Sequence, residues 1–143
     1  MEKTLWYYLK KGMGQRWNAC RHEDRSTPGT PDVSFGISRG LQGWMELKAI
    51  DDWPRRDSTI VRIRHLTRVQ KLWLTRRGET GASCWILVRV KRDYLLFHWT
   101  NIDRLGEMTR SEMYDAATRV YTGSIDWRDF LQAIAYVENR RLQ

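Results

Sequence analysis

The chain has 143 residues, of which 41% are hydrophobic, and this size and composition predict one globular domain rather than a disordered chain. Its 25 Lys and Arg against 17 Asp and Glu give a formal net charge of +8, which favours a polyanion such as nucleic acid as partner. No apolar run approaches the roughly 18 residues of a membrane span, and the N-terminal apolar stretch is too short for a signal peptide. We therefore expect no membrane partner and a cytoplasmic location, with Cys20 and Cys84 as reduced thiols.

The first 22 residues predict a helix followed by a strand. Residues 2–12 place Leu5, Tyr8 and Leu9 on one helical stripe, and glycines follow where the stripe ends. Residues 15–22 then predict a first strand, which leads into a polar stretch.

A β-hairpin is predicted next. Two runs rich in β-branched and aromatic residues, 33–37 and 43–50, flank a connection that contains glycine. Because strand side chains alternate between faces, Glu46 and Lys48 share one face while the residues between them turn towards the core. Asp32 opens the first strand, so the hairpin can bring an Asp, a Glu and a Lys together on one polar surface.

These residue types suit metal-dependent hydrolysis of a phosphodiester. A hard cation takes carboxylate oxygens from Asp32 and Glu46, lowers the pKa of a water and neutralises charge on phosphate. Lys48 would act as a base only with a pKa depressed well below about 10.4, so electrostatic stabilisation is the simpler role. The alternative is that Pro31 and Asp32 form an ordinary turn while Glu46 and Lys48 belong to a solvated strand face.

The spacing Pro31-Asp32, then Glu46-x-Lys48 on the next strand, resembles the signature of the PD-(D/E)XK nuclease superfamily. The surrounding residues are similar to small phage and VRR-NUC-type members and to Holliday-junction-resolvase-like members. This resemblance implies an α/β, restriction-endonuclease-like αβββαβ core with a short mixed sheet and extra C-terminal helices. It also implies Mg²⁺ or Mn²⁺ as cofactor, bound by Asp32, Glu46 and the backbone carbonyl of Leu47, with Lys48 assisting catalysis.

The same resemblance nominates three further site residues. Relatives carry an acidic residue on the first helix, here Glu2, which could equally complement the helix dipole. Others carry Arg-x-Glu before the Pro-Asp turn, which makes Glu23 the preferred additional metal ligand. A Gln on the later helix, here Gln70, faces the site in relatives, but Thr67-x-x-Gln70 also matches a capping box. Both interpretations of Gln70 stay open.

The densest basic region follows the hairpin, where Asp57 is the only acidic residue between positions 55 and 77. Such residues contact phosphates in nucleic-acid complexes, although a charge run can also be a solvated face. Trp53, beside this region, could stack on an unpaired base or pack beneath the loop. The candidate DNA-binding residues are Arg55, Arg56, Arg62, Arg64, Arg68 and Lys71.

The remaining elements alternate between helix and strand. A helix begins near Leu66, and its predicted buried stripe is Leu66, Val69, Leu72 and Trp73. The nearly continuous apolar run 83–90 suits a strand covered on both faces, and a turn joins it to a second strand over 94–99. From Thr100 the pattern is helical, and a last helix starts at 124–127 with the stripe Trp127, Phe130, Leu131, Ile134 and Val137.

The sequence thus predicts a single domain over 1–143, with a core over about 1–99 and a helical extension over about 100–143. The resemblance implies a metal-dependent DNA endonuclease that cuts branched, flap or junction DNA, and relatives of this kind often work as homodimers. Two alternatives stay open: a non-catalytic nucleic-acid-binding domain of the same fold, and a basic protein-interaction module.

Overall fold

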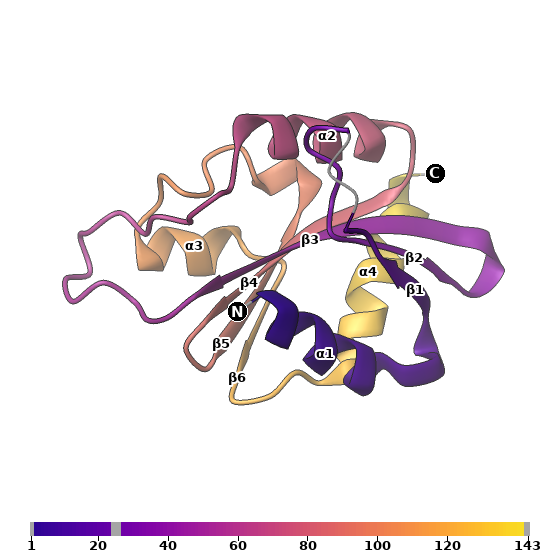
Figure 1. Ribbon diagram of the computed structural model, residues 1–143, viewed down its shortest axis with the longest axis horizontal. Coiled ribbons are helices and arrows are strands. Elements are labelled where there is room, and N and C mark those ends of the chain that lie inside the picture. The colour runs from indigo at the N-terminus through magenta and orange to yellow at the C-terminus, as the bar shows by residue number, and fades with distance from the viewer. Residues whose placement is uncertain (1, 24–26, 142–143) are drawn as a thin grey trace.

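A computed structural model describes residues 2–23 and 27–141, with residues 136–141 as backbone only. The chain forms one mixed six-stranded sheet, in the order β1-β2-β3-β4-β5-β6, with helices on both faces (Figure 1). The helices are α1 (Glu2–Met13), α2 (Arg68–Glu79), α3 (Arg110–Ala116) and α4 (Trp127–Arg141). The strands are β1 (Asn18–Arg21), β2 (Val33–Ile37), β3 (Leu41–Ile50), β4 (Ser83–Val90), β5 (Asp93–His98) and β6 (Arg119–Thr122).

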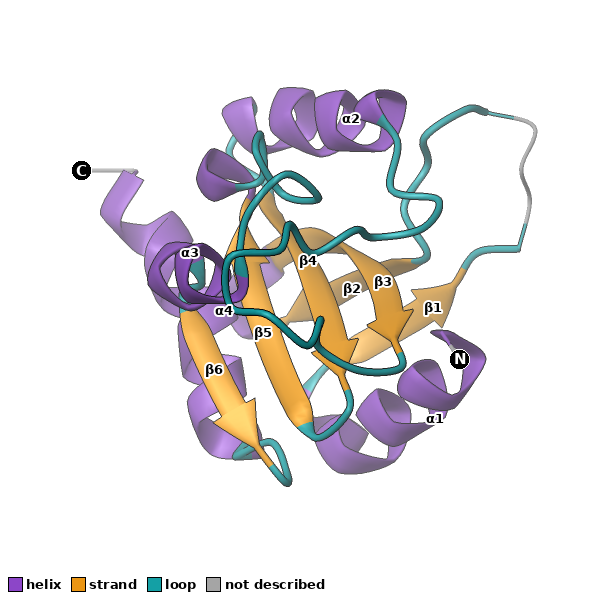
Figure 2. Cartoon of the chain, turned by 90° about the vertical axis from the view of Figure 1, so that its left-hand side faces the viewer, coloured by secondary structure: helices purple, strands orange, loops and turns teal. Residues whose placement is uncertain are grey.

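All neighbouring strands are antiparallel except β3 and β4, which run parallel with Glu46 opposite Ile86. Parallel neighbours need a crossover, and the segment containing α2 supplies it (Figure 2). The order α1-β1-β2-β3-α2-β4 confirms the predicted αβββαβ core, and the predicted α/β fold with a mixed sheet is confirmed with it. Within the described residues no helix has the length and apolar character that crossing a membrane requires.

Two cores lie on the two faces of the sheet. One packs α1 and α4 against β2–β6 through buried side chains such as Leu9, Leu47 and Phe130. The other packs α2, α3 and the segment before α2 against β4 and β5, through side chains such as Leu74 and Val88. Because successive residues of β4 enter opposite cores, the prediction of a strand covered on both faces is confirmed.

The buried side of α2 differs from the predicted stripe. Leu74 is fully buried, whereas Val69 and Leu72 are 50% and 46% exposed, so the prediction that the latter two enter the core is wrong. α2 packs closely against Trp99 at Gly78, where an added Cβ would lie 2.5 Å from the Trp99 ring. This close approach turns Leu74 inward, and Val69 and Leu72 therefore face outward.

The region after Thr100 is less helical than predicted. β6 pairs antiparallel with β5 and forms the last strand of the sheet, which the sequence analysis did not anticipate. α4 begins where expected and buries Phe130 and Ile134. The side chain of Val137, also predicted to be in this stripe, lies outside the described residues.

Candidate functional site

The hairpin β2–β3 brings the predicted acidic residues together. The β2–β3 ladder ends with Val33 opposite Met45, which places Asp32 beside Glu46 just beyond the last pair. The Asp32 backbone N–H donates to Glu46 Oε1 (3.1 Å), and the Leu47 N–H donates to Asp32 Oδ2 (2.9 Å). These two bonds fix both carboxylates at the point where β2 begins.

Lys48 joins this pair from the same face of β3 as Glu46. Its Nζ lies 3.3 Å from Glu46 Oε2 and donates to the backbone carbonyl of His65 (2.8 Å). Asp32, Glu46 and Lys48 are only 9%, 2% and 5% exposed. This burial excludes the alternative that Glu46 and Lys48 belong to a solvated strand face.

Burial dominates the electrostatics of Glu46. Desolvation, followed by the nearby charge of Asp32, raises the pKa of Glu46 to about 7. The charge and hydrogen bond of Lys48 and the Asp32 backbone N–H oppose this rise without cancelling it. Perturbed carboxyl groups of this kind concentrate at functional sites.

The His65 carbonyl is a contributor that the sequence analysis missed. His65 adopts φ 63°, in the left-handed region, within the segment that joins β3 to α2. The same segment buries Val61 and Ile63, and the Val61 N–H donates to the Met108 carbonyl (2.8 Å). A backbone acceptor leaves no mark in residue identity, so no pattern in the sequence could have identified it.

Trp53 anchors the beginning of that segment. Its indole N–H donates to Asp93 Oδ2 (2.8 Å), its ring contacts Tyr114, and the Arg110 guanidinium lies 4.7 Å from its ring centre. These contacts confirm that Trp53 packs beneath the loop, so it does not present its ring to an unpaired base.

Each of the other predicted site residues has a different setting. Glu23 is highly exposed and pairs with Arg21 at 3.7 Å, whereas Glu2 lines a groove of about 530 Å³ beside the end of β3. The Gln70 side chain accepts from the Thr67 N–H (3.0 Å), and the capping box is therefore confirmed. Among the described residues, no group of three or more His, Cys, Asp and Glu side chains could hold a metal ion. A third acidic ligand, Glu23 or Glu2, therefore stays a prediction.

Of the predicted DNA-binding residues, the arginines are exposed, whereas Lys71 is half-buried. Arg62 and Arg64 are exposed and line the same groove as Glu2, next to His65. Lys71 differs, because its ammonium donates to the backbone carbonyls of Asp103 (2.9 Å) and Leu105 (2.6 Å), and burial lowers the pKa of Lys71. Its ammonium therefore ties α2 to the segment before α3. Arg55, Arg56 and Arg68 are exposed.

The donor set suits a hard divalent cation. Asp32 and Glu46 offer carboxylate oxygens. The two negative charges repel each other, so a cation bound between them would be favourable. In a strand the N–H and C=O of one residue face the same neighbour, so the Leu47 carbonyl faces the Asp32 side, as its N–H does. Two carboxylates and one carbonyl leave room for waters and substrate phosphate, the arrangement that Mg²⁺ prefers.

No protein-family model and no curated protein matches this chain. Among solved structures, it is similar to Hjc, a Holliday junction resolvase from the archaeal hyperthermophile Archaeoglobus fulgidus, with TM-score 0.55 and 20% identity over 81% of this chain and 90% of that chain. It is also similar to a VRR_NUC domain, with TM-score 0.45 and 18% identity over 63% of this chain and 85% of that chain. The likeness to Hjc shows that the two chains share a fold, and the sequence resemblance predicted a fold of this kind.

Proposed function

We propose that this chain is a DNA endonuclease that hydrolyses phosphodiester bonds with Mg²⁺ or Mn²⁺ at Asp32, Glu46 and Lys48. The observation that supports it best is the convergence of two carboxylates and one ammonium, all nearly buried, at the start of β2. Removing such charges from water costs several kcal/mol per ion, and apolar residues would often stabilise the fold as well. A catalytic use gives a reason for burying them.

Each residue has a definite role in this proposal. Asp32, Glu46 and the Leu47 carbonyl would hold the ion, which when bound supplies charge neutralisation at the phosphate and a more acidic water. Lys48, fixed by Glu46 and by the His65 carbonyl, would stabilise negative charge on the phosphate oxygens of the transition state. Because its ammonium has two fixed partners, it needs little rearrangement when the substrate arrives.

Branched DNA is the substrate class that we propose. The structure with which the fold is shared belongs to a protein described as a Holliday junction resolvase. The net charge of +8 and the exposed Arg62 and Arg64 beside the site suit a substrate that presents several phosphates close together. Four-way junctions and flaps both have that property.

The decisive experiment compares cleavage of labelled linear duplex, flap and four-way junction DNA, with Mg²⁺ or with EDTA. Lys48→Ala and Asp32→Asn are expected to lower the rate about 100-fold or more, because each removes an electrostatic contact to the reacting phosphate or its metal. Lys10→Ala is the control, since Lys10 is an exposed lysine in the last turn of α1 and has no part in the proposed site.

Metal-dependent cutting that is lost in Lys48→Ala and Asp32→Asn, but retained in Lys10→Ala, supports the proposal, and the preferred substrate identifies the subclass. Cutting that survives in EDTA, or an unchanged rate in both site variants, would contradict it. Tight junction binding without any cutting would assign the chain to non-catalytic binding domains of this fold.

A further inference from the structure

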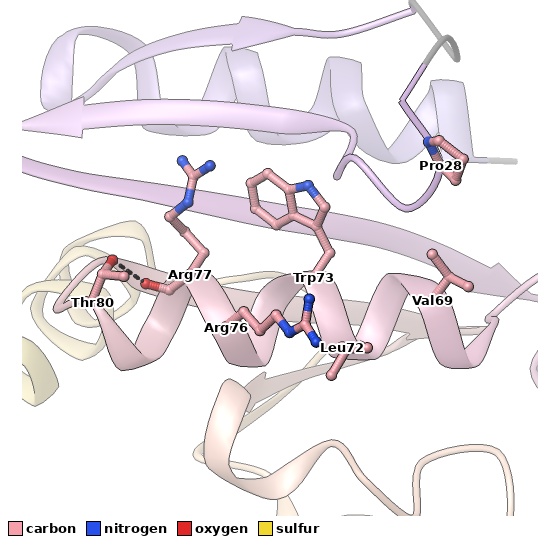
Figure 3. Close-up of a pocket in the computed structure, with 7 residues that line it drawn as sticks. All are labelled: Pro28, Val69, Leu72, Trp73, Arg76, Arg77 and Thr80. Carbon is pink, nitrogen blue, oxygen red and sulfur yellow. Dashed lines mark hydrogen bonds between the residues drawn. The ribbon is translucent and has the colours of Figure 1, made fainter.

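One side of α2 faces solvent and lines a hollow of about 410 Å³. The spacing of three and four residues places its members along one side of the helix, and Figure 3 shows Pro28 across from them. We call this side of α2 the outer stripe, and it consists of Val69, Leu72, Trp73, Arg76 and Arg77.

Exposed apolar side chains are grouped in the outer stripe rather than scattered singly over the surface. Of the four large hydrophobic side chains that are exposed in the described part of the chain, Val69 and Leu72 are two, and they adjoin one another here. Trp73 forms a fixed wall, because its ring meets Trp44 edge-on at 4.9 Å and the Arg77 guanidinium lies 4.5 Å from its centre. Grouped apolar side chains beside a hollow indicate a binding surface.

Charge distinguishes between possible occupants. A two-fold contact with a second copy would bring the same patch of both chains together, so that Arg76 and Arg77 would face their own counterparts. A DNA strand has the opposite charge, and its bases carry apolar faces that stack on aromatic and arginine side chains. We propose that the outer stripe binds an unpaired DNA nucleotide, with the base against Leu72 and Trp73 and the phosphate at Arg76.

The outer stripe adjoins the turn that leads to the candidate catalytic residues. Pro28 belongs to this turn, and Gly29 packs so closely that an added Cβ would lie 2.8 Å from Val69 Cγ1. The chain reaches Asp32 three residues later. An unpaired strand held here would therefore lie beside the site, and its use in selecting flap or junction DNA rests on the function proposed above.

The test measures binding in EDTA, so that no cleavage is required. Fluorescence anisotropy compares a labelled oligothymidylate of about 12 nucleotides with an abasic strand of equal length. Leu72→Ser is expected to weaken binding of the oligothymidylate about 5- to 100-fold and to leave abasic binding unchanged, because it removes only the base contact. Arg76→Gln should weaken binding of both strands and reduce the log–log salt slope by about 0.7.

Two exposed residues elsewhere provide matched controls. Val120→Ser on β6 and Arg128→Gln on α4 make the same kinds of change outside the outer stripe, and both should bind as the wild type does. Circular dichroism confirms that each variant is folded. Equal affinity of the wild type for both strands, or unchanged binding in Leu72→Ser, overturns the proposal.

Sedimentation velocity adds an independent check. A wild-type dimer that Leu72→Ser dissociates would show that the outer stripe contacts a second copy, and this result overturns DNA binding there. The two proposals also fail separately. If the wild type cuts DNA but does not bind the single strands, only the proposal for the outer stripe is refuted. If it binds the single strands but shows no metal-dependent cleavage, only the endonuclease proposal is refuted.

Discussion

Replacing Glu46 by Gln should change how the stability of the protein depends on pH. The folded protein raises the pKa of Glu46 to about 7 from an ordinary value of 4.5, chiefly through burial. Between these values the folded state retains a proton that the unfolded state has lost. Unfolding therefore releases a proton, so the free energy of unfolding of the wild type falls as the pH rises through this window.

The size of the effect follows from the two pKa values. At about 1.4 kcal/mol for each pH unit, the contribution of Glu46 is fully present below about pH 4.5 and declines by about 3 kcal/mol by about pH 7. Glu46→Gln has no such proton to lose. The amide oxygen of Gln can still accept from the Asp32 N–H, and because Gln does not titrate, any other change in packing shifts its whole curve equally at every pH. The stability difference between variant and wild type is therefore the informative quantity.

Urea unfolding followed by tryptophan fluorescence, in EDTA and from pH 4.5 to 8, measures this difference. We expect Glu46→Gln to gain up to about 3 kcal/mol relative to the wild type across the window. Addition of Mg²⁺ at pH 8 should then stabilise the wild type by about 2.7 kcal/mol at 100 times the dissociation constant, and the variant much less. Parallel curves for the two proteins in EDTA would refute the assignment of a raised pKa to Glu46.

Three further predictions concern the surroundings of the site. Gly29→Ala should destabilise the fold by about 2 kcal/mol and slow cleavage, because Gly29 has φ 84° and an added Cβ would lie 2.8 Å from Val69; thermal unfolding and rate measurements check this. Asp93→Ala should lower the free energy of unfolding by about 3 kcal/mol, since three side-chain donors lose a buried acceptor, and urea titration measures the loss. Arg62→Ala should reduce the log–log salt slope of duplex binding by about 0.9, whereas Lys71→Ala should leave it unchanged.

The hairpin and its polar face could be predicted because two independent signals agree there. Strand alternation places Glu46 and Lys48 on one face, and the connection between the two runs brings Asp32 next to them. Each signal depends only on neighbouring residues. The structure adds that the cluster is buried, which depends on the segment before α2 and has no local signal.

Helical periodicity failed at α2 for a physical reason. Spacing shows which side chains share a face, but the packing partner decides which face is buried. Because Gly78 has no side chain, α2 can pack closely against Trp99 on that face. This packing buries Leu74 and leaves Val69 exposed. β6 was missed for a different reason, since a strand of four residues at the edge of a sheet offers too few alternations to detect.

The position of Lys48 depends on residues far along the chain. Its ammonium is held by the His65 carbonyl, and the segment that carries His65 is fastened at Val61 by the Met108 carbonyl and at Trp53 by Asp93. The segment just before α3 thus supplies an anchor for this loop, and the α3 residue Tyr114 donates a further hydrogen bond to Asp93. If Lys48 acts on phosphate, the geometry of its ammonium is set partly by the C-terminal third of the chain. Substitutions there should therefore alter the rate of cleavage as well as stability.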